Sequence, residues 1–316
     1  MKRSFALIDL HCDTLTDWEY TSTGNPNTLD DPKRVLSLSN MPKGVNWAQF
    51  YAVFIPDEHR GQRAIDYFEK NRINFYRQMG LFSDRVAPCR NADDMEAAWT
   101  AGKTAAFLTV ENGSAFAGRI DRVAKLAEQG VCAVTLTWNG ENEIGSGNVT
   151  DHGLTEFGKA AVREMEKQKI LVDVSHLNDH GFFDFLEVAE KPFLATHSNA
   201  RAICSHKRNL TDDMLHEMRH RDCLIGLNYY IKFIRDDGKV TGVDDLYRHI
   251  AHFFDLGLQK NLALGSDFDG AELPDYLDTP TKTMDIYEYL LAHGISQEEA
   301  DGIFYRNAWE FFRKNM

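Results

Sequence analysis

Residues 105–113 read AAFLTVENG, an apolar run that ends on a carboxylate, Glu111. The run is apolar on both faces, which is typical of a parallel strand covered by helices outside and by packed side chains inside. Seven further β-rich runs recur along the chain, with helical stretches between most of them. The eight runs are 5–11, 47–55, 104–110, 131–137, 169–175, 192–197, 222–228 and 261–266. Eight such runs predict an α/β fold of the (β/α)₈ TIM barrel type.

Helical patterns lie between these runs and after the last one. Residue 296 begins a final segment whose Ser296 and Glu299 match a capping box, and this C-terminal helical extension is predicted to pack beneath or beside the barrel. A barrel of about 250 residues uses most of a chain of 316 residues, so we expect one domain, 1–316. The segments with apolar residues at helical spacing are 65–80, 119–130, 155–168 and 243–257.

Composition and charge exclude several classes of function. Thirty-five Lys and Arg residues stand against 48 Asp and Glu, and the net charge of -13 disfavours nucleic acids and anionic lipid surfaces. No stretch approaches the ~20 apolar residues of a membrane span, and the first apolar run reaches Asp9 and His11 too early for a signal peptide. Five scattered cysteines favour free thiols in a reducing compartment. We therefore expect a cytoplasmic protein with no nucleic-acid or membrane partner.

Ionisable side chains follow several runs at the carboxyl end, where barrel enzymes place their sites. His11 and Asp13 are two residues apart after the first run, so in extended conformation they point to the same side. Glu111 ends the third run, His176 the fifth and His197 the sixth. Three histidines and two carboxylates suit Zn²⁺ or a similar ion, and a shared carboxylate can bridge two ions about 3.5 Å apart. The pattern predicts a metal-dependent hydrolase with a two-metal centre.

Other polar residues near these runs have less specific interpretations. Asp267 ends the last run and is placed to accept a proton or to bind a metal, whereas Asp269 is interpreted as a cap of the turn into Gly270. Asp173 is expected to support a metal-bound histidine or, as the less favoured alternative, to form hydrogen bonds in the barrel interior. The histidines interpreted as surface or helix residues are His152, His180, His206, His216, His220, His249, His252 and His293.

Six short motifs follow one another in a fixed order. They are HxD at 11–13, Glu111, VDVSH at 172–176, THSNAR at 196–201, KRNLTDD at 207–213 and GSDFDG at 265–270. Each motif is short, but the order as a whole resembles the membrane (renal) dipeptidase family of the amidohydrolase superfamily. The resemblance extends from residue 9 to about residue 270, which is most of the chain.

The resemblance implies a zinc-dependent dipeptidase with two Zn²⁺ per chain, bridged by Glu111. In this family pattern Arg208 matches the arginine that binds the carboxylate of the substrate, and Asp267 matches the catalytic aspartate. The small-molecule substrate would be a dipeptide, and the resemblance also suggests a homodimer. The implied metal ligands are His11, Asp13, Glu111, His176 and His197.

One departure from the family pattern concerns the substrate. The family has a histidine after the fourth strand that contacts the scissile carbonyl, and this chain has Trp138 there, within TLTWNGEN. An indole donates one hydrogen bond but carries no charge, so a cationic imidazole cannot stabilise the transition state at this position. Either Asn139 or Asn142 donates instead, or the substrate is bound differently.

Two other functions remain open from the sequence. The same barrel and metals could act on another small amide, a lactone or an N-acyl amino acid, and Trp138 is the main support for this alternative. A catalytically inactive barrel that only binds ligands is the second alternative. The loop 21–41, rich in Asn, Asp, Ser and Pro, is predicted to be the most mobile element, and it follows the first run on the catalytic side.

Overall fold

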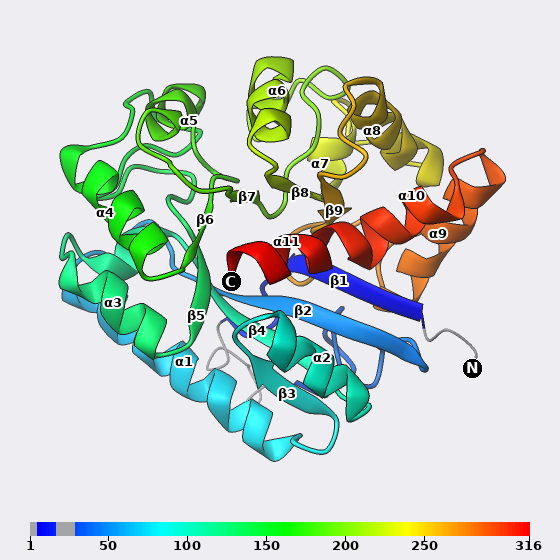
Figure 1. Cartoon of the computed structure of the whole chain (residues 1–316), viewed down its shortest axis with the longest axis horizontal. Helices are drawn as coiled ribbons and strands as arrows, with labels where there is room; N and C mark the ends of the chain where they lie inside the picture. The colour runs from blue at the N-terminus through cyan, green and yellow to red at the C-terminus, as the bar shows by residue number, and fades with distance from the viewer. Residues whose placement is uncertain (1–4, 17–28) are drawn as a thin grey trace.

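A closed barrel of eight parallel strands forms the centre of the computed structural model, which describes residues 5–16 and 29–316 (Figure 1). Around the barrel the strand order is β2-β1-β9-β8-β7-β6-β5-β4, and β4 pairs with β2 to close the ring. The barrel strands are β1 (Phe5–Cys12), β2 (Val45–Phe54), β4 (Thr104–Glu111), β5 (Val131–Thr135), β6 (Leu171–Asp173), β7 (Leu194–Ala195), β8 (Leu224–Leu227) and β9 (Leu262–Leu264). The predicted (β/α)₈ barrel is confirmed, and each of the eight runs overlaps one of its strands.

A further strand, β3 (Val86–Cys89), was not expected from the sequence. It pairs with the first half of β4, whereas the second half of β4 pairs with β5. Its sequence is only VAPC, and Pro88 cannot donate a ladder hydrogen bond, which confines such a segment to an edge position. The short length and the proline explain why the periodicity of the sequence did not reveal it.

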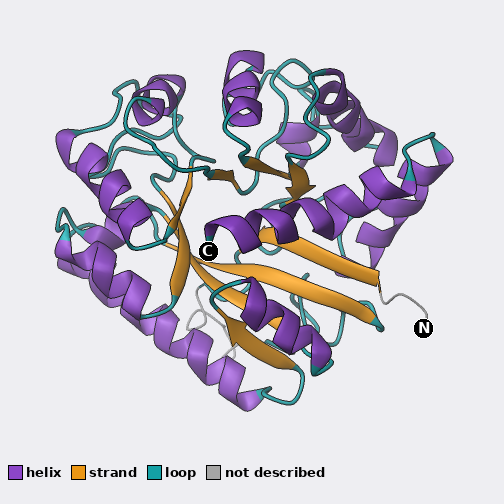
Figure 2. Cartoon of the chain, viewed as in Figure 1, coloured by secondary structure: helices purple, strands orange, loops and turns teal. Residues whose placement is uncertain are grey.

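Helices surround the strands, as Figure 2 shows. Several begin where a side chain accepts a backbone N–H, for example at Thr155, Asn178 and Thr211, and the predicted capping box of Ser296 and Glu299 is present. No helix in the described part of the chain is both long and apolar enough to span a bilayer. The helices are α1 (Gln62–Leu81), α2 (Ala92–Thr100), α3 (Asp121–Glu128), α4 (Glu156–Lys167), α5 (Asp179–Leu186), α6 (Asp212–His220), α7 (Ile231–Ile234), α8 (Val243–Asp255), α9 (Thr283–Ala292), α10 (Gln297–Asp301) and α11 (Asn307–Asn315).

The C-terminal helices complete the core of the barrel. Phe312 of α11 stacks on Phe50 of β2, with ring centroids 5.2 Å apart, and also contacts Phe107 of β4. Phe107 and Glu111 are four residues apart in one strand and therefore lie on the same face. The barrel interior is thus apolar at the end covered by α11 and ionisable at the carboxyl end. The expected packing of the helical extension on the barrel is observed, and the single-domain organisation stays a prediction.

Candidate metal centre and active site

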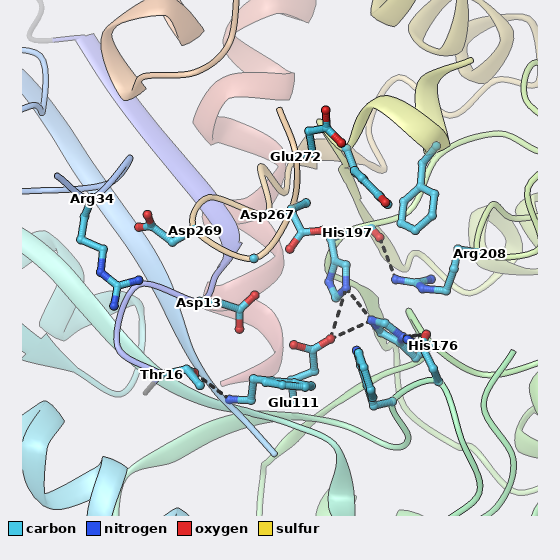
Figure 3. A pocket seen from close by; sticks show the side chains of 17 residues that line it. Asp13, Thr16, Arg34, Glu111, His176, His197, Arg208, Asp267, Asp269 and Glu272 are labelled. Atoms are coloured by element: carbon cyan, nitrogen blue, oxygen red, sulfur yellow. Dashed lines mark hydrogen bonds and ion pairs between the residues drawn. The ribbon is translucent and has the colours of Figure 1, made fainter. Parts of the chain in front are cut away.

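The carboxyl ends of the barrel strands bring the predicted metal ligands together. His11 lies near the end of β1, with Asp13 just beyond it, and Glu111 is the last residue of β4. His176 and His197 lie in the loops that follow β6 and β7. Figure 3 shows Asp13, Glu111, His176 and His197 around one space, and Nε2 of His11 lies 3.5 Å from Oδ2 of Asp13. Residues separated by up to 186 positions in the sequence therefore meet because parallel strands all end on the same rim.

The two carboxylate oxygens of Glu111 face different histidines. Its Oε1 lies 2.7 Å from Nε2 of His176 and 3.7 Å from Nε2 of His197. Its Oε2 lies 3.5 Å from Nε2 of His11, and the same nitrogen lies 3.5 Å from Oδ2 of Asp13. Glu111 therefore stands between a His11–Asp13 pair and a His176–His197 pair, which is the placement that a bridging carboxylate needs.

Unpartnered polar atoms show that this cluster fits a metal. Among the described residues, the buried Nε2 of His11 and Oδ1 of Asp13 have no hydrogen-bond partner. The Nε2 atoms of His176 and His197 lie 3.0 Å apart, so two ring nitrogens converge on one place. Buried polar atoms without a partner are costly, and a divalent cation would satisfy them. The nitrogen and oxygen set suits zinc and related ions.

Hydrogen bonds on the far side of two histidine rings fix which nitrogen faces the cluster. Thr196 Oγ1 donates to Asp173 Oδ2 at 2.6 Å, so Nδ1–H of His197 is left to donate to Thr196 Oγ1, 2.8 Å away. Nδ1 of His176 lies 3.3 Å from Oδ1 of Asn139, which can only accept. Protons on both Nδ1 atoms leave the Nε2 lone pairs free to bind a metal.

Asp173 organises three neighbouring strand ends. Its carboxylate accepts hydrogen bonds from the hydroxyl groups of Thr135, Ser175 and Thr196, and from two backbone N–H groups. It contacts no histidine directly, and it reaches His197 through Thr196. Both interpretations of Asp173 are therefore partly right, because the residue is a hydrogen-bonding centre of the barrel interior that also orients one predicted ligand.

Burial and charge shift the pKa values within the cluster. Burial raises the pKa of Glu111 to about 7, and the charge of Asp13 adds to this. Burial lowers the pKa of His176 and of His197 well below the ordinary value, and neighbouring cations lower it further. Burial alone would lower the pKa of His11 too, but the charges of Glu111 and Asp13 outweigh it and raise that pKa. Neutral rings at 176 and 197 are the form that binds a metal.

A pocket of about 610 Å³ opens above the cluster, and Arg208 lies at one end of it (Figure 3). Arg208 is 4% exposed, and its Nε and Nη1 atoms have no partner among the described residues. Its guanidinium lies 5.3 Å from the ring centroid of Phe233, and burial lowers its pKa to about 10, so it remains charged near neutral pH. A buried arginine with free donors suits a bidentate carboxylate.

The three residues proposed around the missing family histidine lie in different surroundings. Trp138 lines the pocket and packs edge-on against Phe54, with ring centroids 4.8 Å apart. Asn139 also lines the pocket, but its Oδ1 faces His176 and accepts from Asn148 at 2.7 Å. Asn142 is buried outside the lining, because its amide bonds Asn112, Leu136, Ile144 and Gly145 in the loop that follows β5. The structure therefore does not bring Asn142 to the pocket with Trp138 and Asn139, and the Asn142 amide serves the loop.

Asp267 lies beside the cluster in an unusual backbone conformation. Its Oδ1 is 3.9 Å from Nε2 of His11, and its Oδ2 accepts from Nδ2 of Asn228 at 3.0 Å. Its φ is +65°, which asparagine and aspartate tolerate better than most residues. A Cβ on Gly270 would lie 2.0 Å from Oδ2 of Asp13, so only glycine lets this turn approach the cluster. Asn228 was missed in the sequence because a single asparagine after a strand has no distinctive spacing.

The interpretation of Asp269 as a simple turn cap was too limited. Its carboxylate accepts from Thr14 Oγ1 at 2.6 Å and from the backbone N–H groups of Val35 and Leu36 at 2.8 and 3.2 Å. Asp269 thereby joins the turn after β9 to the segment after β1. Of the predicted mobile loop 21–41, residues 21–28 lie outside the described residues, and in the described part Val35 and Leu36 are bonded to Asp269.

One histidine outside the cluster is a helix residue, as predicted, but is buried rather than on the surface. His249 lies in α8 but is fully buried, where its Nδ1 accepts from the N–H of Ala200 and its Nε2 lies 3.0 Å from the carbonyl of Ile234. This pairing holds the loop after β7 against α8. It is a structural role that the helical pattern of the sequence does not reveal.

The barrel together with a cluster of buried histidines and carboxylates defines a metal-dependent hydrolase. Comparison with known families makes this assignment more specific. The family described as Membrane dipeptidase (Peptidase family M19) matches residues 1–315, so the chain belongs to this family and is a metal-dependent dipeptidase. The resemblance found in the sequence is confirmed, and the alternative of a catalytically inactive barrel is at odds with this finding.

One relative and two solved structures illustrate the similarity. The uncharacterized protein in pqqA 5'region of Klebsiella pneumoniae is 32% identical over 243 residues, which cover 73% of this chain and 89% of the relative. A crystal structure of a metallo peptidase from Rhodobacter sphaeroides, liganded with a phosphinate mimic of the dipeptide L-Ala-D-Ala, has a TM-score of 0.90 at 24% identity and covers 99% of this chain and all of that one. The dipeptidase AC, a metallo peptidase of family M19, has a TM-score of 0.89 at 25% identity, with 99% of both chains covered.

Proposed function

We propose that this protein is a zinc-dependent dipeptidase that binds two Zn²⁺ bridged by Glu111 and cleaves the peptide bond of small dipeptides. The observation that carries the proposal is the position of Glu111, with one oxygen toward His11 and the other toward His176 and His197, in a pocket that also contains the buried Arg208. The metal cluster and the anion-binding group thus face the same space. Their combination suits a small substrate with a free carboxylate.

The proposed metal ligands divide into two sets that share Glu111. His11 and Asp13 complete the first set, and His176 and His197 complete the second. These residues would hold two divalent cations, which would supply a water of lowered pKa and a Lewis acid for the carbonyl group. The chain itself holds the histidine rings in the required tautomer through Thr196 and Asn139.

Asp267 is the residue that we propose as the proton acceptor. Its Oδ1 faces the cluster near His11, and its Oδ2 is fixed by Asn228, so the carboxylate cannot turn away. From this position it would take a proton from the attacking water and pass it to the leaving amine. Asn228 therefore acts on the reaction by positioning Asp267.

Arg208 is the proposed site for the carboxylate at the C-terminus of the substrate. The guanidinium is buried, is flanked by Phe233, and has two nitrogen atoms without partners among the residues described. The phosphinate dipeptide mimic in the Rhodobacter sphaeroides structure supports a dipeptide as the substrate class. A substrate anchored by its terminal carboxylate must be short, because the pocket places Arg208 close to the metal cluster.

Replacement Arg208→Lys is expected to lower kcat/KM for Ala-Ala by about 10- to 100-fold, because a lysine cannot form two parallel hydrogen bonds to a carboxylate. The bound metal should stay unchanged. Steady-state kinetics and elemental analysis on the same preparation measure both quantities. Lys207→Ala changes the exposed neighbouring residue and should leave kcat/KM as in the wild type. Loss of metal in Arg208→Lys would contradict the assigned role.

The proposed function as a whole is tested by metal content and a dipeptide panel. Protein purified without chelator should contain about two zinc ions per chain, and hydrolysis of Ala-Ala should stop on metal removal and return when zinc is added. Bound metal without cleavage of any dipeptide would contradict the substrate class. Protein that binds no metal under these conditions would contradict the catalytic proposal.

A second candidate function follows from Trp138. The indole and Phe54 form an aromatic wall beside His176 where the family has an imidazole, so another small amide, a lactone or an N-acyl amino acid is the alternative substrate. Dipeptides with a free or an amidated C-terminus distinguish the two functions. A requirement for the free carboxylate supports the dipeptidase. The homodimer and the cytoplasmic location stay predictions.

A further inference from the structure

A second arginine, Arg34, lines the same pocket as Arg208. In Figure 3 the two arginines lie at opposite sides of the view, with Asp13 and Glu111 between them. The pocket therefore has an arginine at each end, with Asp269 beside Arg34 and the carboxylates of the proposed metal cluster between the two. The proposed function uses Arg208 and the cluster, and it does not yet say what Arg34 contributes to substrate binding.

Asp269 fixes the segment that carries Arg34 to the rim of the metal cluster. The N–H groups of Val35 and Leu36 donate to this carboxylate, and so does the hydroxyl of Thr14, the residue after Asp13. The carbonyl of Arg34 also accepts from Nδ2 of Asn40 at 3.0 Å. The backbone after Arg34 is thus bonded to Asp269 at the rim of the cluster, its carbonyl is bonded to Asn40, and its half-buried side chain lines the pocket.

The orientation of the substrate in the proposed function determines which part of the substrate lies next to Arg34. With the C-terminal carboxylate on Arg208 and the scissile carbonyl at Glu111, the N-terminal residue lies on the side of Asp13 and Arg34. A dipeptide spans at most about 7 Å along its backbone, so a side chain is needed to reach further. The guanidinium of Arg34 suits a carboxylate on the side chain of this residue.

We propose that Arg34 selects dipeptides whose N-terminal residue is aspartate or glutamate. The proposal rests on the proposed dipeptidase function and deepens it by naming the preferred substrate class. Arg34 acts here as a specificity-determining residue that touches the substrate side chain. It takes no part in proton transfer or in metal binding.

The test compares two substrates of nearly equal shape, Glu-Ala and Gln-Ala, together with Ala-Ala. For the wild type, kcat/KM should be about tenfold higher for Glu-Ala than for Gln-Ala, as expected for one charge-assisted hydrogen-bonded pair. Arg34→Gln should bring this ratio to about one and leave kcat/KM for Ala-Ala as it is. Lys33→Gln removes a neighbouring exposed charge and should keep the tenfold ratio.

The outcomes separate this inference from the function on which it rests. Cleavage of Ala-Ala with equal kcat/KM for Glu-Ala and Gln-Ala in the wild type overturns the role of Arg34 and leaves the dipeptidase intact. A preference that is found only for Ala-Glu over Ala-Gln overturns it as well, because the carboxylate would then lie on the other residue. An equal loss for all substrates in Arg34→Gln would show a purely structural residue. Failure of the wild type to cleave any dipeptide contradicts the proposed function itself.

Discussion

Replacement Glu111→Gln is expected to lower kcat/KM for Ala-Ala by at least about 10³-fold and to reduce the bound metal below two ions per chain. A carboxamide keeps the size of the side chain but offers one oxygen instead of two, so it cannot bridge the groups on its two sides. Loss of a bridging ligand removes several kcal/mol of transition-state stabilisation, and each ~1.4 kcal/mol is a factor of ten. Elemental analysis and steady-state kinetics measure the two effects.

A matched control for this variant is Glu141→Gln, which makes the same chemical change at an exposed position on the catalytic rim. The control should keep both the metal content and the activity. The bridging assignment is contradicted if Glu111→Gln retains two ions per chain with unchanged kinetics. A loss of activity with full metal content would instead place Glu111 in direct contact with the reacting groups.

Replacement Asp267→Asn is expected to lower kcat by about 10²- to 10⁴-fold, the usual contribution of a general base, while KM and the metal content stay close to the wild type. Asparagine tolerates the φ of +65° at this position, so the backbone of the turn should be kept. The amide cannot take a proton from water. Kinetics over a range of Ala-Ala concentrations separate kcat from KM.

Asp222→Asn is a suitable control, because Asp222 also has a positive φ of +53° but is exposed. It should leave kcat unchanged. The result that would count against the proton-transfer role is a loss of one metal ion in Asp267→Asn. His11, Asp13 and Asp267 lie close enough to form a metal site of their own, so Asp267 would then be a ligand.

Much of the fold could be predicted from local patterns. Runs such as 105–110 and 262–264 are apolar on both faces, as expected of parallel strands buried on both sides. β3 could not be predicted, because four residues that include Pro88 carry no periodic signal. Strands β6 and β7 are shorter than the predicted runs 169–175 and 192–197. The last residues of these runs belong to the loops that carry His176 and His197.

The candidate site was predicted to a different extent for different residues. The strand positions were enough to group five residues, because all of them lie at or just after the carboxyl end of a strand and parallel strands end on one rim. These residues are His11, Asp13, Glu111, His176 and His197. For loop residues, no comparable rule predicts which side chains face the pocket. Asn139 and Asn142 lie in the same loop, but the amide of Asn142 forms hydrogen bonds within the loop, whereas Asn139 faces His176. A sequence pattern cannot show which of the two amides faces the pocket.

By itself the sequence determined the barrel, the rim and the set of ionisable groups on it, because these depend on strand periodicity and on the residue at each strand end. Only the tertiary structure decided how the groups divide around Glu111, that Thr196 and Asn139 set the histidine tautomers, and that Asp269 holds Arg34 at the pocket. These features depend on side-chain distances of a few ångströms between segments far apart in the chain, and local sequence patterns do not encode such distances.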